Sequence, residues 1–238
     1  LAGDAAAGIL PTWPDGIGCV EIYHHQSMWD VRQHPALHAV FADLFGTDRL
    51  WVSIDRVNRK TPKPAAGELG QGFLHWDINI NQRPRPFEVQ GLVALADQDA
   101  AMGGFQCLPG LYRDLDSWLA RQPCGKAQNP WLNVAEYVGE MVRVSLSAGE
   151  LLIWDSFMPH GNGVNRGERV RYAQYVTMFP EGGSRLCRER RQCWLDRSPP
   201  SGWAFPGDPR GLERLAPLAR LTDLGERLLG VLGQEDGR

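Results

Sequence analysis

The sequence predicts a fold of the α+β class that is mainly β, with a jelly-roll core of two sheets flanked by helices. Two observations lead to this prediction. Short runs rich in β-branched and aromatic residues recur along the chain, and Gly, Pro, Asn and Asp separate them. Segments with helical periodicity are few and lie mainly toward the two ends. Many short strands between turns are typical of a double-sheet jelly roll.

Helical periodicity and end signals predict the helices. The predicted helices cover residues 35–45, 111–122 and 221–232. In the first, Pro35 suits the first turn and Gly46 suits the position just after the last residue. In the third, Thr222 is a suitable N-cap. The second has the weakest pattern of the three.

Strand-like runs fill the segments between these helices. The predicted strands are 50–57, 72–80, 87–96, 104–108, 141–147, 150–154 and 170–179. The chain has 238 residues and no internal repeat or low-complexity linker. We therefore expect a single domain over 1–238, because all-β domains of this length are common.

Composition excludes several classes of partner. The net charge of −3 provides no basic field for nucleic acid, and no apolar run is long enough to span a membrane. The N-terminal residues do not resemble a secretory signal. The five cysteines are odd in number and irregularly spaced, which favours reduced thiols and a cytoplasmic protein. No pattern bears on the oligomeric state.

The run GFLHWDINI, residues 72–80, places two polar side chains in an otherwise apolar strand. Side chains of a strand alternate between its faces, so His75 and Asp77 are expected on one face and Trp76 in the core on the other. An imidazole and a carboxylate side by side are suitable ligands for a metal ion. A lone His-x-Asp is common by chance, however, so the interpretation as a metal site needs support from the surrounding sequence.

His160 is the best candidate for a third ligand. It follows the strand-like run ELLIWD and the turn SFMP, and a second turn, GNGVN, comes after it. We expect it in a turn at the mouth of the jelly roll. Two histidines and one carboxylate on one face are the set that holds iron(II) in oxygen-activating enzymes.

A basic strand follows His160. In ERVRYAQYVTMFP, alternation places Arg169 and Arg171 on one face. A guanidinium matches a carboxylate with two parallel hydrogen bonds, so either arginine could hold a dicarboxylate co-substrate at the end remote from the metal. The alternative is that both arginines are surface residues of an edge strand.

The sequence resembles the phytanoyl-CoA dioxygenase-like family of Fe(II)/2-oxoglutarate-dependent oxygenases over about residues 50–180. The motifs are HWD at 75–77, GGFQCLPG at 103–110, GELLIWD at 149–155 and HGNGVNRGERVR at 160–171. The resemblance implies a double-stranded β-helix in which His75, Asp77 and His160 ligate Fe(II). It also implies that 2-oxoglutarate chelates the iron and places its distal carboxylate on Arg171. Asn162 and Gln90 are implied as further co-substrate contacts.

The resemblance also implies a reaction type. Related halogenases have a small residue where this chain has Asp77, so the carboxylate implies hydroxylation or another oxidation of a small molecule by O2, with release of succinate and CO2. Two alternatives stay open: a cupin-type metal enzyme that does not use 2-oxoglutarate, and a non-catalytic jelly-roll protein that binds a small molecule. Arg171 argues against the former, and the intact set of three ligands argues against the latter. The substrate itself is not predicted.

Two other segments have polar side chains to which the motifs assign no role. His24 and His25 are neighbours, so in a strand they would point to opposite faces, and structural or surface roles are expected for them. The arginine-rich residues 184–197 are expected to form a solvated face; a lid over an anionic substrate is the alternative.

Overall fold

The computed structural model describes residues 18–62, 72–122, 131–201, 207–208 and 211–231. The chain forms two compact units. We call Cys19–Val57 together with Gln174–Arg238 the helical unit, and Asn58–Ala173 the sheet unit. The expectation of a single domain over 1–238 stays a prediction.

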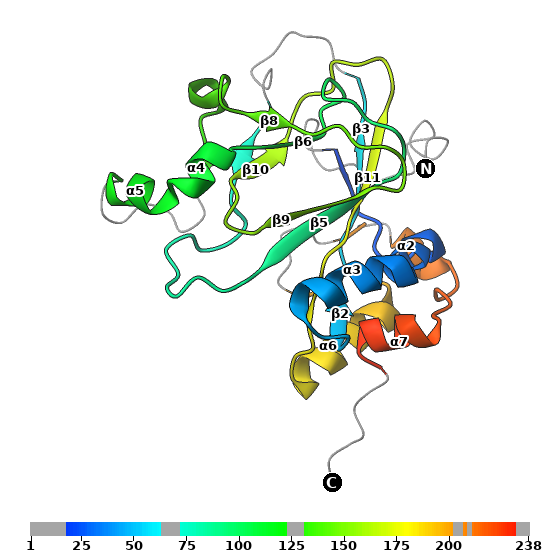
Figure 1. Cartoon of the computed structure of the whole chain (residues 1–238). Coiled ribbons are helices and arrows are strands. Elements are labelled where there is room, and N and C mark those ends of the chain that lie inside the picture. The colour runs from blue at the N-terminus through cyan, green and yellow to red at the C-terminus, as the bar shows by residue number, and fades with distance from the viewer. Residues whose placement is uncertain (1–17, 63–71, 123–130, 202–206, 209–210, 232–238) are drawn as a thin grey trace. The chain divides into compact units, whose positions relative to one another are not determined.

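The sheet unit holds two sheets of short strands (Figure 1). One runs in the order β3-β11-β5-β9 and the other in the order β7-β4-β10-β6-β8, with antiparallel pairing along the second sheet and between β5 and β9. The strands are β3 (Val57–Lys60), β4 (Leu74–His75), β5 (Val89–Ala94), β6 (Phe105–Cys107), β7 (Trp131–Leu132), β8 (Val142–Arg143), β9 (Leu151–Asp155), β10 (His160–Asn162) and β11 (Arg171–Tyr175).

The chain passes repeatedly from one sheet to the other. From β8 onward every step changes sheet: β8 and β10 belong to the second sheet, and β9 and β11 to the first. This alternation is what a double-stranded β-helix requires, because its two sheets are built from strands that are not consecutive. The predicted fold class, mainly β with accompanying helices, is confirmed.

The helical unit contains most of the helices and one small antiparallel sheet. Its elements are β1 (Cys19–Val20), α2 (Gln26–Arg32), α3 (Pro35–Phe45), β2 (Leu50–Val52), β12 (Met178–Pro180), α6 (Ser184–Asp196), the 3₁₀ helix η2 (Leu212–Leu215) and α7 (Asp223–Leu229). The predicted ends of α3 are confirmed, with Pro35 in the first turn and Gly46 left-handed at the C-cap. Thr222 caps α7, since its side chain accepts a hydrogen bond from the Gly225 N–H.

One helix prediction was wrong in detail. The helix expected over 111–122 is divided at Asp114 into α4 (Pro109–Arg113) and α5 (Leu115–Ala120).

The arginine-rich segment is the helix α6. Arg185, Arg188 and Arg191 are exposed, in agreement with the expected solvated face, whereas Arg190 is buried. The Arg190 guanidinium donates to the backbone carbonyls of Val52, Leu228 and Leu229, so this arginine joins the packed interior of the helical unit.

The predicted strand over 72–80 is shorter than expected, but its two-faced character is confirmed. β4 ends at His75, and Asp77 lies in a bend. Trp76 is buried and its indole N–H donates to the Phe157 carbonyl. The apolar side of this segment packs in a cluster with α4 and α5: Leu74, Trp76, Ile80, Leu108, Leu111, Leu115, Val134 and Phe157. This packing turns His75 to the opposite side.

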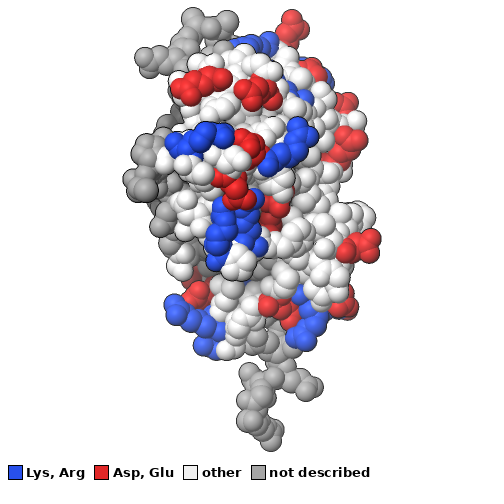
Figure 2. Space-filling view, turned by 60° about the vertical axis from the view of Figure 1, so that its left-hand side comes forward, with Lys and Arg blue, Asp and Glu red and all other residues white. Residues whose placement is uncertain are grey.

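Charged side chains of both signs are mixed on the face drawn in Figure 2, without a broad area of one sign. Arg83 and Arg85, for example, both pair with Asp116. No helix within the described residues is long and apolar enough to cross a membrane. No disulfide joins the four described cysteines, Cys19, Cys107, Cys187 and Cys193.

Candidate metal centre

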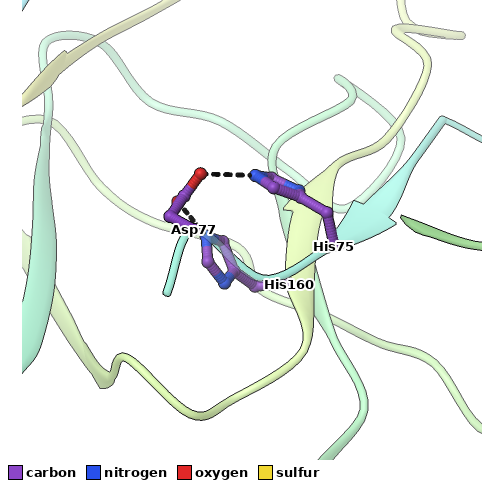
Figure 3. Close-up of side chains that lie close together, drawn as sticks. All are labelled: His75, Asp77 and His160. Carbon is purple, nitrogen blue, oxygen red and sulfur yellow. Dashed lines mark hydrogen bonds and ion pairs between the residues drawn. The ribbon is translucent and has the colours of Figure 1, made fainter. Parts of the chain in front are cut away.

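His75, Asp77 and His160 come together in the sheet unit (Figure 3). One ligand atom from each lies within 4.8 Å of the other two. His75 Nε2 is 2.9 Å from Asp77 Oδ1, and His160 Nε2 is 3.3 Å from Asp77 Oδ2. Two imidazole nitrogens and one carboxylate therefore converge as a three-sided set of donors.

Strand pairing brings these residues together. His160 is the first residue of β10 and lies opposite His75 in the antiparallel pair of β10 and β4. The expected turn at His160 was wrong, because β10 pairs with β6 on its other side and is an inner strand. Asp77 reaches the centre from the bend that follows β4.

A close backbone approach permits this pairing. A Cβ on Gly161 would lie 1.9 Å from the carbonyl oxygen of Phe73, a separation that no side chain could tolerate. Gly161 therefore lets β10 approach the chain that leads into β4. The small residue after His160 is part of how the centre is built.

Hydrogen bonds orient His160. Its Nδ1 is 2.9 Å from the carbonyl oxygen of Met158. A carbonyl only accepts, so Nδ1 carries a proton, and Nε2 is the ring nitrogen that faces Asp77. This is the tautomer that a metal needs, and such outer contacts commonly fix a ligating imidazole.

A second pair of contacts orients Asp77. The Gln90 side-chain amide donates to Asp77 Oδ2 at 2.9 Å, and the Trp154 indole N–H donates to Gln90 Oε1 at 2.8 Å. Trp154 thus sets which way the Gln90 amide points. The predicted contact of Gln90 with a co-substrate stays a prediction, and Gln90 here supports the carboxylate.

Aromatic rings hold both histidines from the side. The His75 ring lies 5.1 Å from Trp131 and 5.2 Å from Phe73, measured between centroids. The His160 ring lies 5.1 Å from Trp154. These contacts restrict rotation of the imidazoles, so the donor set is organised in advance.

Asp77 is negatively charged at neutral pH. Partial burial disfavours the carboxylate, but hydrogen bonds from His160 and His75 outweigh it and hold the pKa of Asp77 well below its usual range. With its side chain half exposed, Asp77 is also reachable from solvent. It is a charged ligand with an open approach.

Arg171 is a buried charged residue of the sheet unit. It is fully buried, whereas Arg169 is exposed. Its Nη1 donates to Asn58 Oδ1 at 2.8 Å and to Asn162 Oδ1 at 3.2 Å, and its Nε donates to Gln98 Oε1. The structure thus brings the predicted Asn162 to Arg171. Sequence reasoning missed Asn58 and Gln98, because neither belongs to a recognisable motif.

Other polar side chains near these motifs and in the helical unit make local contacts. Asp155 Oδ1 accepts from the Phe157 N–H, and Glu150 Oε2 accepts from the Ser147 N–H, so both shape turns. In the helical unit His25 caps α2 through its side chain. Burial, followed by the charge of Arg32, lowers the pKa of His24 to about 3. A neutral His24 has the structural role expected of it.

Comparison with curated proteins gives two relatives at 25% identity. No family model matches the chain. "Ava biosynthesis cluster protein O" of Aspergillus versicolor aligns over 177 residues, which is 67% of this chain and 56% of that protein. "Putative phytanoyl-CoA dioxygenase" of Dictyostelium discoideum aligns over 97 residues, which is 39% of this chain and 27% of that protein. The chain is thus similar, over part of its length, to a protein described as a phytanoyl-CoA dioxygenase. It spans about half or less of the length of these relatives.

Solved structures resemble this chain in fold. GlcNAc Inducible Gene 2 from Candida albicans has a TM-score of 0.69 at 12% identity, over 100% of this chain and 72% of that one. The epimerase SnoN, solved with Fe3+, alpha ketoglutarate and nogalamycin RO, has a TM-score of 0.51 at 21% identity, over 87% and 80%. These likenesses agree with the mainly β architecture.

Proposed function

We propose that this phytanoyl-CoA dioxygenase-like chain is an Fe(II)- and 2-oxoglutarate-dependent oxygenase that oxidises a C–H bond of a small molecule with O2, releasing succinate and CO2. The observation that carries the proposal is the convergence of His75, Asp77 and His160 within 4.8 Å. The donor atoms, their protonation and their supporting contacts all suit one divalent iron.

The donor set fits Fe(II) by its chemistry. Two neutral imidazole nitrogens and one carboxylate leave further coordination positions for ligands that are not protein, as in mononuclear iron oxygenases. Met158 holds the tautomer of His160, and Gln90 holds the carboxylate of Asp77. Fe(II), when bound, would supply the redox chemistry that couples a 2-oxo acid to O2. The protein would hold it and orient the reactants.

Arg171 supports 2-oxoglutarate as the co-substrate. Asn58, Gln98 and Asn162 each present a neutral amide oxygen to its guanidinium. These oxygens orient the buried guanidinium. A carboxylate would provide both charge and a two-pronged match. Asn162, one of the co-substrate contacts implied by the resemblance, is within reach of that same carboxylate.

Asp77 favours oxidation over halogenation, because its carboxylate occupies the side of the centre where a halide would need to bind. SnoN is an epimerase, however, so stereochemical inversion is a second outcome to be measured. A cupin-type enzyme without 2-oxoglutarate is less well supported, since such a reaction would not use the guanidinium of Arg171. A non-catalytic binder would not need the oriented tautomer of His160.

Anaerobic titration tests the proposal. Purified chain should bind one equivalent of Fe(II), and added 2-oxoglutarate should produce the visible absorption band of an iron–2-oxo acid chelate. Admitting O2 with a metabolite library should then release succinate in the presence of the true substrate. Absence of stoichiometric iron, or of any band at millimolar 2-oxoglutarate, would refute the assignment. Product mass and chirality would identify the reaction.

A further inference from the structure

We propose that Gln98 is a co-substrate-binding residue that donates a hydrogen bond from its side-chain amide to the distal carboxylate of 2-oxoglutarate, beside Arg171. This inference rests on the proposed function and adds a residue to it. It follows from the orientation, the anchoring and the burial of a single side chain.

The orientation of the Gln98 amide is forced by its partner. Its Oε1 accepts from Arg171 Nε. A guanidinium has donors only, so the opposite orientation would bring two N–H groups together. The oxygen must therefore face Arg171, and the NH2 group must point elsewhere in the same amide plane.

The backbone of Gln98 is held in place. Its N–H donates to the Leu146 carbonyl at 2.8 Å, and the Leu146 N–H donates back to the Gln98 carbonyl at 2.9 Å. The two residues form an isolated antiparallel bridge. A side chain on so fixed a backbone loses little further freedom when it binds a ligand, which favours affinity.

The N–H groups of the Gln98 amide are available to donate hydrogen bonds to a ligand. Gln98 is 4% exposed, and among the described residues its Nε2 has no hydrogen-bond partner. An unsatisfied buried donor destabilises the folded protein, so it points to a partner that arrives with a ligand. The position of this donor beside a buried cation indicates an anionic acceptor.

Gly104 lies against this pair. A Cβ on Gly104 would lie 3.2 Å from Gln98 Oε1, closer than most side chains come, and 3.6 Å from Arg171 Nε, an ordinary contact. The absence of a side chain at Gly104 keeps one source of crowding away from the two groups. Two donors of different kinds, one charged and one neutral, can then contact one carboxylate.

Two substitutions test Gln98 directly. Gln98→Met keeps the approximate length and removes the amide, and Gln98→Glu keeps an acceptor for Arg171 but replaces the NH2 group by a charged oxygen. Binding is measured anaerobically with Fe(II) by the chelate band, using 2-oxoglutarate and 2-oxopentanoate, which has a methyl group in place of the distal carboxylate. Normal binding of 2-oxopentanoate shows that a variant is folded and holds iron.

The expected pattern is selective. Gln98→Met should weaken the binding of 2-oxoglutarate about tenfold, because one hydrogen bond to a charged group is lost. The affinity for 2-oxopentanoate should change by no more than about twofold. Gln98→Glu should weaken the binding of 2-oxoglutarate by about a hundredfold or more, because a carboxylate would then face the ligand's carboxylate. Its preference should move toward 2-oxopentanoate.

Asn58→Asp is the matched control. It places a carboxylate on the same guanidinium and leaves the Gln98 amide intact. If Asn58→Asp lowers the affinity for 2-oxoglutarate less than Gln98→Glu does, the result supports a direct contact between Gln98 and the co-substrate. An equal loss, or wild-type affinity in both Gln98 variants, would overturn the assignment. A wild-type chain that binds neither 2-oxo acid would instead refute the proposed function itself.

Discussion

His160 and Asp77 have their orientations set by neighbours before any ligand binds. The Met158 carbonyl holds the proton of His160 on Nδ1, and the Gln90 amide holds one oxygen of Asp77. Prior organisation of this kind lowers the cost of assembling a metal centre, and loss of such outer contacts typically costs tenfold or more in metal affinity. At the scale of residues, the candidate centre depends on its supports as well as its ligands.

Removing ligands should remove the metal. We expect His75→Ala, Asp77→Ala and His160→Ala each to abolish turnover, because each leaves only two donors of the three. The double variant His75→Ala/Asp77→Ala should lose stoichiometric iron, measured by elemental analysis after gel filtration. Full iron content in a variant lacking all three side chains would place the metal elsewhere.

The two arginines of the basic strand should behave differently. Arg171→Lys keeps the charge but loses the two-pronged geometry, so the 2-oxoglutarate concentration for half-maximal binding should rise tenfold or more, about 1.4 kcal/mol. Arg169→Lys is the control, because Arg169 is exposed. A large effect from Arg169→Lys with none from Arg171→Lys would reverse the assignment.

Chloride should not enter the intact centre. Because Asp77 fills the third protein position, chloride added to the iron–2-oxoglutarate complex should leave its visible absorption band unchanged, and products should contain no halogen at high salt. Asp77→Gly should open that position to chloride and lose hydroxylation. A chlorinated product from the unmodified chain would mean that Asp77 is not a ligand.

The pairing of β10 with β4 sets the separation of the two histidines. His160 and His75 lie opposite each other in this pair, and Gly161 permits the approach, since its α-carbon faces the Phe73 carbonyl. At the scale of elements, the geometry of the centre therefore depends on a contact between backbones. A side chain at this point would separate the strands that carry two of the three ligands.

Gly161→Ala should displace His160 from His75. A Cβ 1.9 Å from a backbone oxygen cannot be relieved by a rotamer change, so β10 has to shift. We expect lower iron affinity and a lower melting temperature, measured by titration and by circular dichroism. Gly110→Ala is the matched control, because a Cβ there meets no atom within 4 Å. Wild-type iron affinity in Gly161→Ala would show that the pairing tolerates separation.

The described chain comprises two compact units, and all three candidate ligands belong to the sheet unit. In the helical unit the side chains of Arg32 and Arg190 are buried and donate to backbone carbonyls. Burial lowers the pKa of both guanidinium groups to about 10. Both remain charged at neutral pH. At the scale of the whole molecule, all three candidate ligands lie in one unit, so an effect of metal binding on stability should begin there.

Metal binding should stabilise the folded chain. A ligand that binds only the native state adds about 2.7 kcal/mol at a free concentration one hundred times its Kd. Mn(II), a redox-stable substitute, should therefore raise the melting temperature and protect amides of β4 and β10 from hydrogen exchange, with β2 and β12 as internal reference. A chelator should reverse the shift. The same shift in the His75→Ala/Asp77→Ala variant would indicate binding at another site.

Sequence patterns predicted which three side chains would meet better than the local structure that carries them. His75, Asp77 and His160 could be chosen from residue types and local context, and the structure brings all three together. The reasons were partly wrong: the strand ends at His75, and His160 begins a strand where a turn was expected. Alternation along one strand was a sound guide to Leu74 and Trp76, because burial of a face is a local, periodic property.

The sequence by itself determined the fold class, the ends of α3, the candidate ligands and the choice of Arg171 through its motif. These depend on short-range periodicity, capping and residue chemistry, which are readable along the chain. Only the tertiary structure decided that Asn58 and Gln98 hold Arg171, that Gln90 supports Asp77 and that Gly161 admits the approach of β10. Such contacts join residues far apart in sequence, and strand pairing decides them. A single sequence contains no periodic signal for which strands will meet.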